Sequence, residues 1–289
     1  MPRSRADGPY GAADAWGGVC PFPVPGRLAK PRENGVTMVI DKGVGASTTD
    51  DYLELVGGTV DLLKLAFGTT AFYSEPILRK KIEVCARHGV ACYPGGTFLE
   101  VAVVQSRGRD FLKRAHDLGF RYIEISDGTI QMSTRTRLRL IELAQQMGLR
   151  VLTEVGKKHP ADRVPRSNIR EQIASDLANG AWKVIVEGRE SGKGVVIYRD
   201  DGSIDDDELE GLATAADPQR LIWEAPLKAQ QQDLILRFGP NVNLGNVEPG
   251  DALSVESLRV GLRGDTLRAA ILGSAIPAAN GVGDEEKPT

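Results

Sequence analysis

The 289-residue sequence has few of the residues that build disulfide frameworks or metal-thiolate centres. Its three cysteines, Cys20, Cys85 and Cys92, are odd in number, and none falls in a CxxC or Cys/His cluster. Neither a disulfide framework nor a structural zinc site is therefore expected, and the cysteines are predicted to be reduced thiols. The three histidines share no ligand spacing, which argues against catalysis by a histidine.

Long apolar runs and a field of one charge sign are also missing. No apolar stretch approaches a membrane span, and the first residues, MPRSRADGPYGAADAW, contain no signal-peptide core. The formal net charge is −3 and the basic residues form no stripe. Neither a nucleic acid nor a membrane surface is therefore predicted as a partner, and a cytoplasmic location is expected by default.

The stretch KVIVEGRESGKGVVIY, residues 183 to 198, lacks the spacing of a nucleotide-binding loop. A Walker A loop needs four residues between its first glycine and the Gly-Lys pair, followed by Ser or Thr. Here three residues separate Gly188 from Gly192 and Lys193, and Gly194 follows. No GxGxxG follows the first expected strand either, which weakens the case for an open doubly wound sheet.

What the sequence does contain is a unit that recurs roughly every 30 residues, as a βα repeat would. In five segments a helical tail ends at a glycine suited to a left-handed cap, and a short apolar β-type run follows: 87–96, 117–128, 146–156, 178–188 and 237–246. Three further β-type runs, 35–43, 59–68 and 219–226, complete eight strands. Segments with apolar residues at helical spacing lie between them, such as 74–89, 133–148 and 227–239.

Eight strands alternating with helices predict an α/β fold, a single (β/α)₈ TIM barrel over residues 35–270. The Gly- and Pro-rich residues 1–34 are predicted to form an irregular N-terminal arm. Residues 271–289 are predicted to form a flexible tail.

Alternation along the strands directs several charged side chains toward the barrel axis. In YIEIS, Ile123 and Ile125 share the face expected to pack on helices, which leaves Tyr122, Glu124 and Ser126 on the axial face. The same count points inward Glu154, Glu187 and Glu224, with Lys64 and Asn243 on the second and eighth strands.

Barrel active sites lie at the C-terminal strand ends, so the four glutamates are predicted to face one mouth. Any one of them has about even odds of being only a structural ion-pair partner of Lys64 and its neighbours. Four in register favour a site for Mg²⁺, which prefers oxygen ligands.

Basic residues after the strand ends predict an anionic substrate: Lys42, Lys157, Lys158, Arg189, Lys193 and Lys228. In the loop 188–194, Arg189, Lys193 and the backbone amides of Gly192 and Gly194 are candidates to receive a phosphate or sulfonate. The alternative for this loop is a solvated turn. Near the C-terminus, Arg263 is placed to reach the eighth loop near Asn243 and Asn246, where barrels often bind phosphate.

Nine segments resemble the phosphosulfolactate synthase family: MVIDKG, LLKLAFGTT, YPGGTFLE, IEISDGTI, VLTEVGKK, VIVEGRESGKG, EAPLKAQQ, NLGN and GLRGDTL. The resemblance runs from about Gly35 to Leu267. It implies a magnesium-dependent barrel, a carbon–sulfur lyase that adds sulfite to phosphoenolpyruvate to give (2R)-phospho-3-sulfolactate in coenzyme M biosynthesis. The family includes plant heat-tolerance relatives. The alternative is therefore a non-catalytic stress or protein-stability factor, or a barrel that acts on another phosphorylated enol.

The implied chemistry gives the residues at the mouth their roles. Sulfite attack on the methylene carbon forms an enediolate-like intermediate, whose charge a glutamate-bound Mg²⁺ would stabilise. A lysine must then protonate the neighbouring carbon, and Lys64, Lys157 and Lys158 remain open as that acid, with a pKa expected to be lowered by desolvation among other cations. A homo-oligomer is compatible with the sequence.

Three departures from the family pattern lie in mouth loops, so the shape of the pocket is expected to differ. They are Phe67 in place of Trp, Phe98-Leu99 in place of Leu-Phe, and Leu227-Lys228-Ala229 in place of Gln-Lys-Ser.

Overall fold

The structure is a computed structural model that describes residues 15–16, 19–159, 162 and 164–273. All eight predicted strands form, and all pair in parallel. They are β1 (Thr37–Asp41), β2 (Leu62–Leu65), β3 (Ala91–Pro94), β4 (Tyr122–Ile125), β5 (Arg150–Val155), β6 (Lys183–Val186), β7 (Leu221–Glu224) and β8 (Leu244–Val247).

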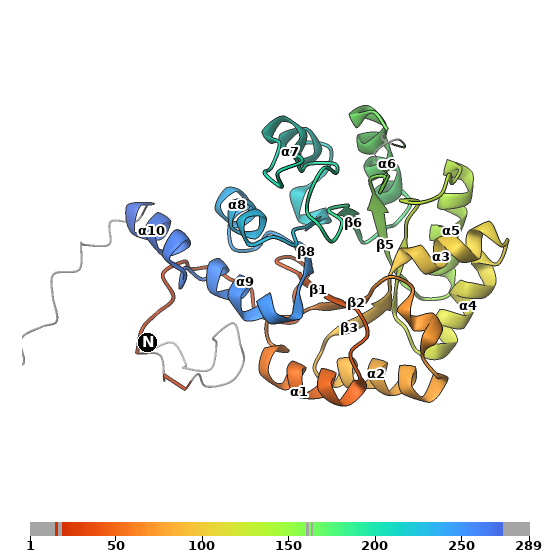
Figure 1. The fold of residues 1–289 in the computed structure, drawn as a ribbon, viewed down its shortest axis with the longest axis horizontal. Helices are drawn as coiled ribbons and strands as arrows, with labels where there is room; N and C mark the ends of the chain where they lie inside the picture. The colour runs from red at the N-terminus through yellow and green to blue at the C-terminus, as the bar shows by residue number, and fades with distance from the viewer. Residues whose placement is uncertain (1–14, 17–18, 160–161, 163, 274–289) are drawn as a thin grey trace, which may run out of the picture.

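Helices follow the strands and surround them (Figure 1). They are α1 (Ala46–Val56), α2 (Glu75–Arg87), α3 (Gly96–Val104), α4 (Gly108–Leu118), α5 (Thr134–Gln146), α6 (Arg166–Ala178), α7 (Asp206–Ala213), α8 (Lys228–Phe238), α9 (Ala252–Arg259) and α10 (Gly264–Gly273). Short 3₁₀ turns are η1 (Thr69–Phe72), η3 (Pro218–Arg220) and η4 (Pro249–Asp251).

The strand order is β3-β2-β1-β8-β7-β6-β5-β4, so the chain winds almost completely around one axis. Strands β3 and β4 lie side by side, but no hydrogen-bonded ladder joins them within the described residues. The fold is therefore a single (β/α)₈ TIM barrel that is nearly closed, as the sequence predicted.

The predicted alternation of the strands is confirmed by two separate apolar clusters. Ile123 and Ile125 belong to the large cluster between strands and helices. A smaller cluster fills the barrel interior: Val36, Met38, Leu62, Tyr93, Leu152, Ile185 and Ile222, with Tyr122 packed against it. Lys64, Glu154 and Glu224 each stand two residues beyond a member of the interior cluster, so an apolar floor lies beneath the charged groups.

Local signals in the sequence explain where the helices end. The glycines that end the five repeated helical tails, residues 89, 119, 148, 180 and 239, all have positive φ, which few other residues adopt without strain. Ser133 caps α5, since its hydroxyl accepts from the amide of Thr136 at 3.2 Å. Ser74 precedes α2 as predicted, but its side chain makes no capping bond.

The described part of the N-terminal arm crosses the end of the barrel opposite to the strand C-termini. Arg27 forms a buried ion pair with Glu256 of α9 at 2.7 Å. Arg32 pairs with Asp61, just before β2, at 2.8 Å. Glu33 binds Arg150 and Trp182 at the starts of β5 and β6. The arm therefore links elements from both sides of the barrel and closes its N-terminal end.

Asn241 ties this arm to the loop before β8, and we expect its removal to weaken the fold modestly. Its amide nitrogen donates to the carbonyl of Gly26 at 2.8 Å, and its oxygen accepts from the amide of Leu28 at 3.1 Å. Asn241→Ala should lower the free energy of unfolding by about 1–2 kcal/mol, because two hydrogen bonds to the backbone of the arm are lost. Urea unfolding measures this, with Asn179→Ala, whose amide bonds only within its own helix end, as the control. Equal losses in both variants would contradict a specific role for the arm.

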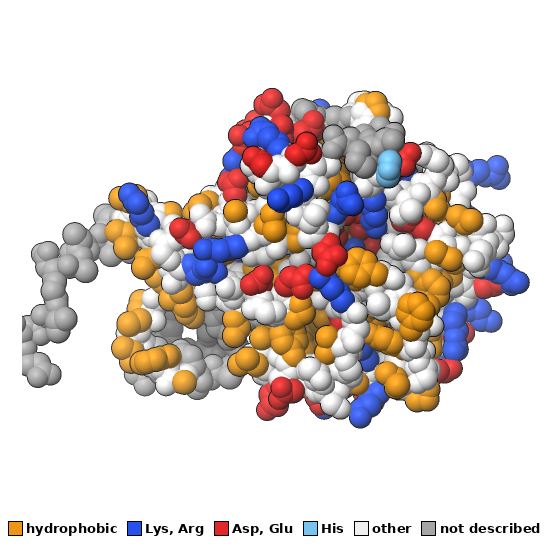
Figure 2. Space-filling model, viewed as in Figure 1, with side chains coloured by type: hydrophobic (Ala, Val, Ile, Leu, Met, Phe, Trp, Pro, Cys, Tyr) orange, Lys and Arg blue, Asp and Glu red, His pale blue; other side chains and the backbone are white. Residues whose placement is uncertain are grey.

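At the other end of the chain, the described residues stop within α10. Of the predicted tail 271–289, residues 271–273 are helical, and the remainder lies outside the described residues. Among the described residues no helix combines the length and apolarity that a membrane span requires. On the face shown in Figure 2, acidic and basic side chains lie side by side near the centre, with no field of one sign.

Candidate active site

Five ionisable side chains form a charged layer above the apolar floor: Lys64, Glu124, Glu154, Glu187 and Glu224. All five are buried. The ammonium group of Lys64 lies 3.0 Å from Glu124 Oε2, 3.0 Å from Glu154 Oε2 and 3.1 Å from Glu224 Oε1. The structure thus brings the four predicted glutamates together, with Lys64 among them.

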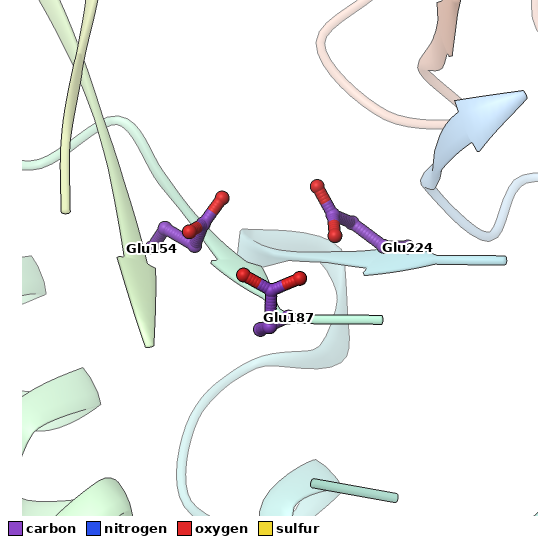
Figure 3. Close-up of side chains that lie close together, drawn as sticks. All are labelled: Glu154, Glu187 and Glu224. Carbon is purple, nitrogen blue, oxygen red and sulfur yellow. The ribbon is translucent and has the colours of Figure 1, made fainter. Parts of the chain in front are cut away.

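Three of these carboxylates converge on one small space. Glu154, Glu187 and Glu224 each offer an oxygen, and these atoms lie within 4.8 Å of one another. Figure 3 shows the three carboxyl groups pointing toward one another from β5, the end of β6 and β7. Glu187 Oε2 and Glu154 Oε1 are buried and have no hydrogen-bond partner among the residues that the structure describes. An oxygen cluster of this kind suits a hard divalent cation.

Backbone amides fix the orientation of three of the carboxylates. Glu124 Oε1 accepts from the amide of Gly96 at the start of α3, at 2.7 Å. Glu187 Oε1 accepts from the amide of Arg189 at 2.6 Å, and Glu224 Oε2 accepts from the amide of Gly188 at 2.9 Å. These fixed donors hold the acids in place without consuming all of their oxygens.

A second lysine reaches the layer from the side of the cavity. Lys158 Nζ lies 3.4 Å from Glu154 Oε1 and 3.6 Å from Glu187 Oε2, and it donates to Thr97 Oγ1 at 3.3 Å. Its side chain is about three times as exposed as that of Lys64. Lys158 therefore faces both the carboxylates and the open space beside them.

That space is a cavity of about 500 Å³ at the C-terminal ends of the strands, called here the mouth cavity. Besides the charged layer and Lys158, its lining comprises Ile40, Ala66, Phe67, Gly95, Gly96, Thr97, Thr129, Arg189, Glu190, Ser191 and Asn246. Its volume and the charged layer that lines it fit a small polar ligand.

Burial and neighbouring charges shift the pKa values of the glutamates in opposite directions. Burial raises the pKa of Glu124 to about 7. Burial, with the charges of Glu154 and Glu224, raises the pKa of Glu187 well above its ordinary value. Burial also opposes ionisation of Glu154, but Lys158 and Lys64 outweigh it and hold the pKa of Glu154 below its usual range. The layer thus contains acids of opposite tendency side by side.

The expectation that desolvation lowers the pKa of a mouth lysine is wrong for both lysines of this cavity. Burial does oppose the charged form of Lys64, but Glu124, Glu154 and Glu224 together raise its pKa well above the ordinary value. Glu154 is the main cause that raises the pKa of Lys158, against the effect of burial. Both lysines are therefore held as ammonium ions by their acidic neighbours.

Several of the predicted site residues lie away from the mouth cavity. Lys157 turns outward and binds Asp127 Oδ2 at 2.8 Å and the carbonyl of Ile130 at 2.9 Å. Asn243 precedes β8, and its amide binds backbone at the N-terminal end of the barrel, including the carbonyl of Leu221 at 2.8 Å. Arg263 donates to Ser254 Oγ at 2.7 Å.

The predicted residues of the outer loops also make contacts of their own. Lys42 bridges Glu190 and Glu248, and Lys228 lies 3.6 Å from Asp265. In the loop after β6, Arg189 lines the cavity, whereas Lys193 is exposed and does not. From the sequence, the amide of Gly194 is predicted to donate to the substrate anion. In the structure this amide donates instead to the carbonyl of Arg199 at 3.0 Å. Gly192 is buried with φ of 64°, and its carbonyl accepts from Gln230 at 2.7 Å.

Some residues that shape the site were not singled out in the sequence. Glu100 is buried on α3 and accepts from Ser126 Oγ at 2.5 Å and from the amide of Thr129 at 2.9 Å, which fixes the loop after β4. Arg137 donates to the carbonyl of Glu154 at 2.9 Å and pairs with Asp176 at 2.7 Å. Both Glu100 and Arg137 are charged residues on the apolar face of a helical segment, and this pattern could have identified them from the sequence.

Comparisons with known proteins agree on one family over most of the chain. A family model described as (2R)-phospho-3-sulfolactate synthase (ComA) matches residues 25–265. The phosphosulfolactate synthase of Methanothermobacter thermautotrophicus is 42% identical over 248 residues, which cover 85% of this chain and 96% of that protein. The Arabidopsis thaliana protein HEAT-STRESS-ASSOCIATED 32 is 24% identical over 256 residues, which cover 81% of this chain and 88% of that protein.

Solved structures support the fold alone. The crystal structure of 3-hexulose-6-phosphate synthase from Salmonella typhimurium superposes with a TM-score of 0.55 at 14% sequence identity. The superposed region covers 79% of this chain and 100% of the synthase chain.

Proposed function

The chain belongs to the phosphosulfolactate synthase family, and from that premise we propose that its mouth cavity catalyses the magnesium-dependent addition of sulfite to phosphoenolpyruvate. The product is (2R)-phospho-3-sulfolactate, a precursor of sulfonates such as coenzyme M. The observation that carries this proposal is the charged layer together with Lys158, because four buried carboxylates and two ammonium groups thereby line one cavity at the strand ends. A barrel that served only as a scaffold would have no use for so many desolvated charges at its mouth.

The carboxylates of the layer fit a divalent cation. Glu154, Glu187 and Glu224 would hold it, since an oxygen of each converges on one space, and one oxygen of Glu154 and one of Glu187 have no hydrogen-bond partner among the described residues. A divalent cation would also favour the ionised form of Glu187, whose pKa is raised by burial and by the charges of Glu154 and Glu224. When bound, Mg²⁺ supplies stabilisation of the negative charge that develops on the substrate carboxylate.

The chemistry itself requires one new carbon–sulfur bond and one proton. The sulfur lone pair of sulfite attacks the methylene carbon of phosphoenolpyruvate, and the electrons of the double bond move through the adjacent carbon into the carboxylate. That adjacent carbon then takes a proton as the carboxylate re-forms. No group leaves, so the phosphate stays on the product.

We assign the proton donor to Lys158. Its ammonium group is the more exposed of the two lysines of the cavity, and the carboxylates of Glu154 and Glu187 keep it charged and oriented. Lys64, enclosed by three glutamates, is assigned the role of holding them together before substrate arrives. Lys157 is left out because its ammonium group is occupied by Asp127 outside the cavity.

Direct contact with the substrate anion is assigned to Arg189 and Asn246, the predicted substrate-binding residues whose side chains line the cavity. The other members of that predicted set, Lys42, Gly192, Lys193, Gly194, Lys228, Asn243 and Arg263, do not line it. The lysines and Arg263 are proposed to sustain positive charge around the mouth, and Gly192 and Gly194 to shape the loop after β6. Asn243 lies at the other end of the barrel and has no part in the site. Because phosphoenolpyruvate is a cytoplasmic metabolite, we place the reaction in the cytoplasm, where the enzyme can act as a monomer or a homo-oligomer.

Removal of divalent metal is expected to lower turnover about tenfold or more, because the negative charge that develops on the substrate would then lack its stabilising cation. The measurement is the rate of phosphoenolpyruvate consumption with sulfite, before and after chelation by EDTA. Added Mg²⁺ should restore the rate. Unchanged turnover in excess EDTA would remove the metal from the proposal.

A further inference from the structure

Five non-glycine residues of the described chain have positive φ: Phe67, Ser106, Arg189, Val196 and Asn246. Three of the five line the mouth cavity, at φ of 57° for Phe67, 56° for Arg189 and 52° for Asn246. Phe67 follows β2, Arg189 follows β6, and Asn246 lies near the end of β8, so the three residues reach the cavity from separate strands. A side chain in this backbone region is strained, and for a bulky residue such as Phe it is rare.

The two left-handed residues outside the cavity are explained by their turns. Ser106 lies between α3 and α4, and its amide donates to the carbonyl of Val103 at 2.9 Å as the chain reverses. Val196 lies between Val195 and Tyr198, which pair across a tight turn. In both cases the backbone conformation serves a local hydrogen-bonded connection.

The backbones of two cavity residues also take part in local hydrogen bonds, since the amide of Arg189 donates to Glu187 Oε1 and a turn from Ala66 to Thr69 spans Phe67. What sets the three apart is that their side chains lie in the cavity with few polar partners among the described residues. The amide oxygen of Asn246 is buried without a hydrogen-bond partner, although the residue is only 5% exposed. The guanidinium of Arg189 forms no ion pair with any described residue, and 54% of Phe67 is exposed at the rim. A strained backbone at residues whose side chains face a cavity is typical of ligand-binding positions.

We propose that Phe67, Arg189 and Asn246 form a substrate-contacting rim, in which a strained backbone is retained because it aims these side chains into the cavity. The inference rests on the proposed function and deepens it by naming the residues that select the substrate. Arg189 provides two parallel donors for a phosphate or sulfonate group. The side-chain NH₂ group of Asn246 donates to a substrate oxygen, and the ring of Phe67 covers the short carbon skeleton and displaces water from it.

This arrangement selects a small acid with a three-carbon skeleton and at least one tetrahedral anionic group. Longer phosphorylated acids would meet the ring of Phe67, and an acid without the phosphate would leave Arg189 unpaired. A guanidinium placed to hold an anion through two donors favours an acid that provides this anion over one that lacks it.

The test replaces each rim residue by glycine, because glycine accepts positive φ without strain and lacks the side chain. Phe67→Gly, Arg189→Gly and Asn246→Gly should keep or raise the melting temperature by up to a few degrees, about the size expected when backbone strain is relieved. The same variants should raise the Michaelis constant for phosphoenolpyruvate about tenfold each, the scale of one lost hydrogen bond or charged contact. Ser106→Gly is the matched control, which should gain stability in the same way with an unchanged Michaelis constant.

The proposal is supported if the rim variants keep or gain melting temperature and have a raised Michaelis constant, while the Michaelis constant of the control stays unchanged. A melting temperature that falls by several degrees in the rim variants would give these residues a structural role and overturn it. Parent-like Michaelis constants would overturn it as well.

A second readout separates failure of this inference from failure of the proposed function. Inorganic phosphate is used as the probe in a thermal-shift titration, which requires no turnover. If the parent binds phosphate but does not convert phosphoenolpyruvate, the proposed function fails and the rim is judged on phosphate alone. In that case a shift lost in Arg189→Gly and kept in Ser106→Gly supports the rim, and equal shifts in both overturn it.

Discussion

Glu154→Gln is expected to lower turnover by about 10²- to 10³-fold while the barrel stays folded, because one fixed charge is lost from a water-excluded site. Glu154 provides one oxygen to the carboxylate cluster and both of its oxygens to lysines, with Lys64 at 3.0 Å and Lys158 at 3.4 Å. Glutamine keeps the volume and removes the charge. The metal would therefore lose a ligand, and the proposed proton donor would lose the main group that keeps it charged and oriented.

Steady-state kinetics at saturating Mg²⁺, together with circular dichroism, measures this effect. Glu142→Gln, on the exposed face of α5, is the control and should match the parent. A Glu154→Gln enzyme with more than half of the parent's turnover would show that the charged layer is only structural.

Lys64→Met is expected to damage both the fold and the activity, since it leaves three buried carboxylates without their shared cation. Removing one partner of a buried ion pair commonly costs about 3–5 kcal/mol, mostly because the remaining charge stays desolvated. The pKa of Lys64 is raised well above its usual value despite burial, which shows how strongly its three acidic neighbours stabilise the ammonium form. We expect a loss of unfolding free energy of about 3 kcal/mol and a fall in turnover of about 10³-fold.

The two effects of Lys64→Met can be separated with the metal. If Lys64 serves mainly to hold the carboxylates together, Mg²⁺ should restore much of the variant's stability by taking over the same charges. Urea unfolding with and without Mg²⁺ measures this, with Lys80→Met on the exposed face of α2 as the control. Parent-like stability of Lys64→Met in EDTA would contradict the assigned role.

The fold and the charged layer could be predicted from the sequence because both depend on strict periodicity. Parallel strands alternate in side-chain direction, so the position of Ile123 on one face placed Glu124 on the other. The C-terminal ends of barrel strands meet at one mouth, so glutamates counted separately on four strands had to converge. The contacts of Lys64 with Glu124, Glu154 and Glu224 follow from these two rules.

Loops carry no such periodicity, and there the sequence could not decide. Lys157 and Lys158 are neighbours, but one binds Asp127 outside the cavity and the other reaches Glu154 inside it. Asn243 and Asn246 are three residues apart, yet they lie at opposite ends of β8. The direction of a lysine pKa shift depends on which charges surround it, so it also required the three-dimensional arrangement.

The positive φ angles of the rim residues could not be predicted from the sequence either, for a different reason. Phe67 and Arg189 are not residue types that predict positive φ, so no sequence pattern pointed to their conformation. Local preferences and the observed structure disagree most often where a side chain has a function to serve. The mouth cavity is such a place, with three of the five left-handed non-glycine residues of the described chain.

The most direct test of the central claim is mass spectrometry of the reaction product. Purified protein is incubated with phosphoenolpyruvate, isotopically labelled sulfite and Mg²⁺, in parallel with Glu154→Gln. The account predicts a metal-dependent product that contains the labelled sulfur bonded to carbon, retains the phosphate, and forms far more slowly in the variant. Absence of any such product from the folded parent enzyme, or its formation at equal rates by parent and variant, would contradict the account.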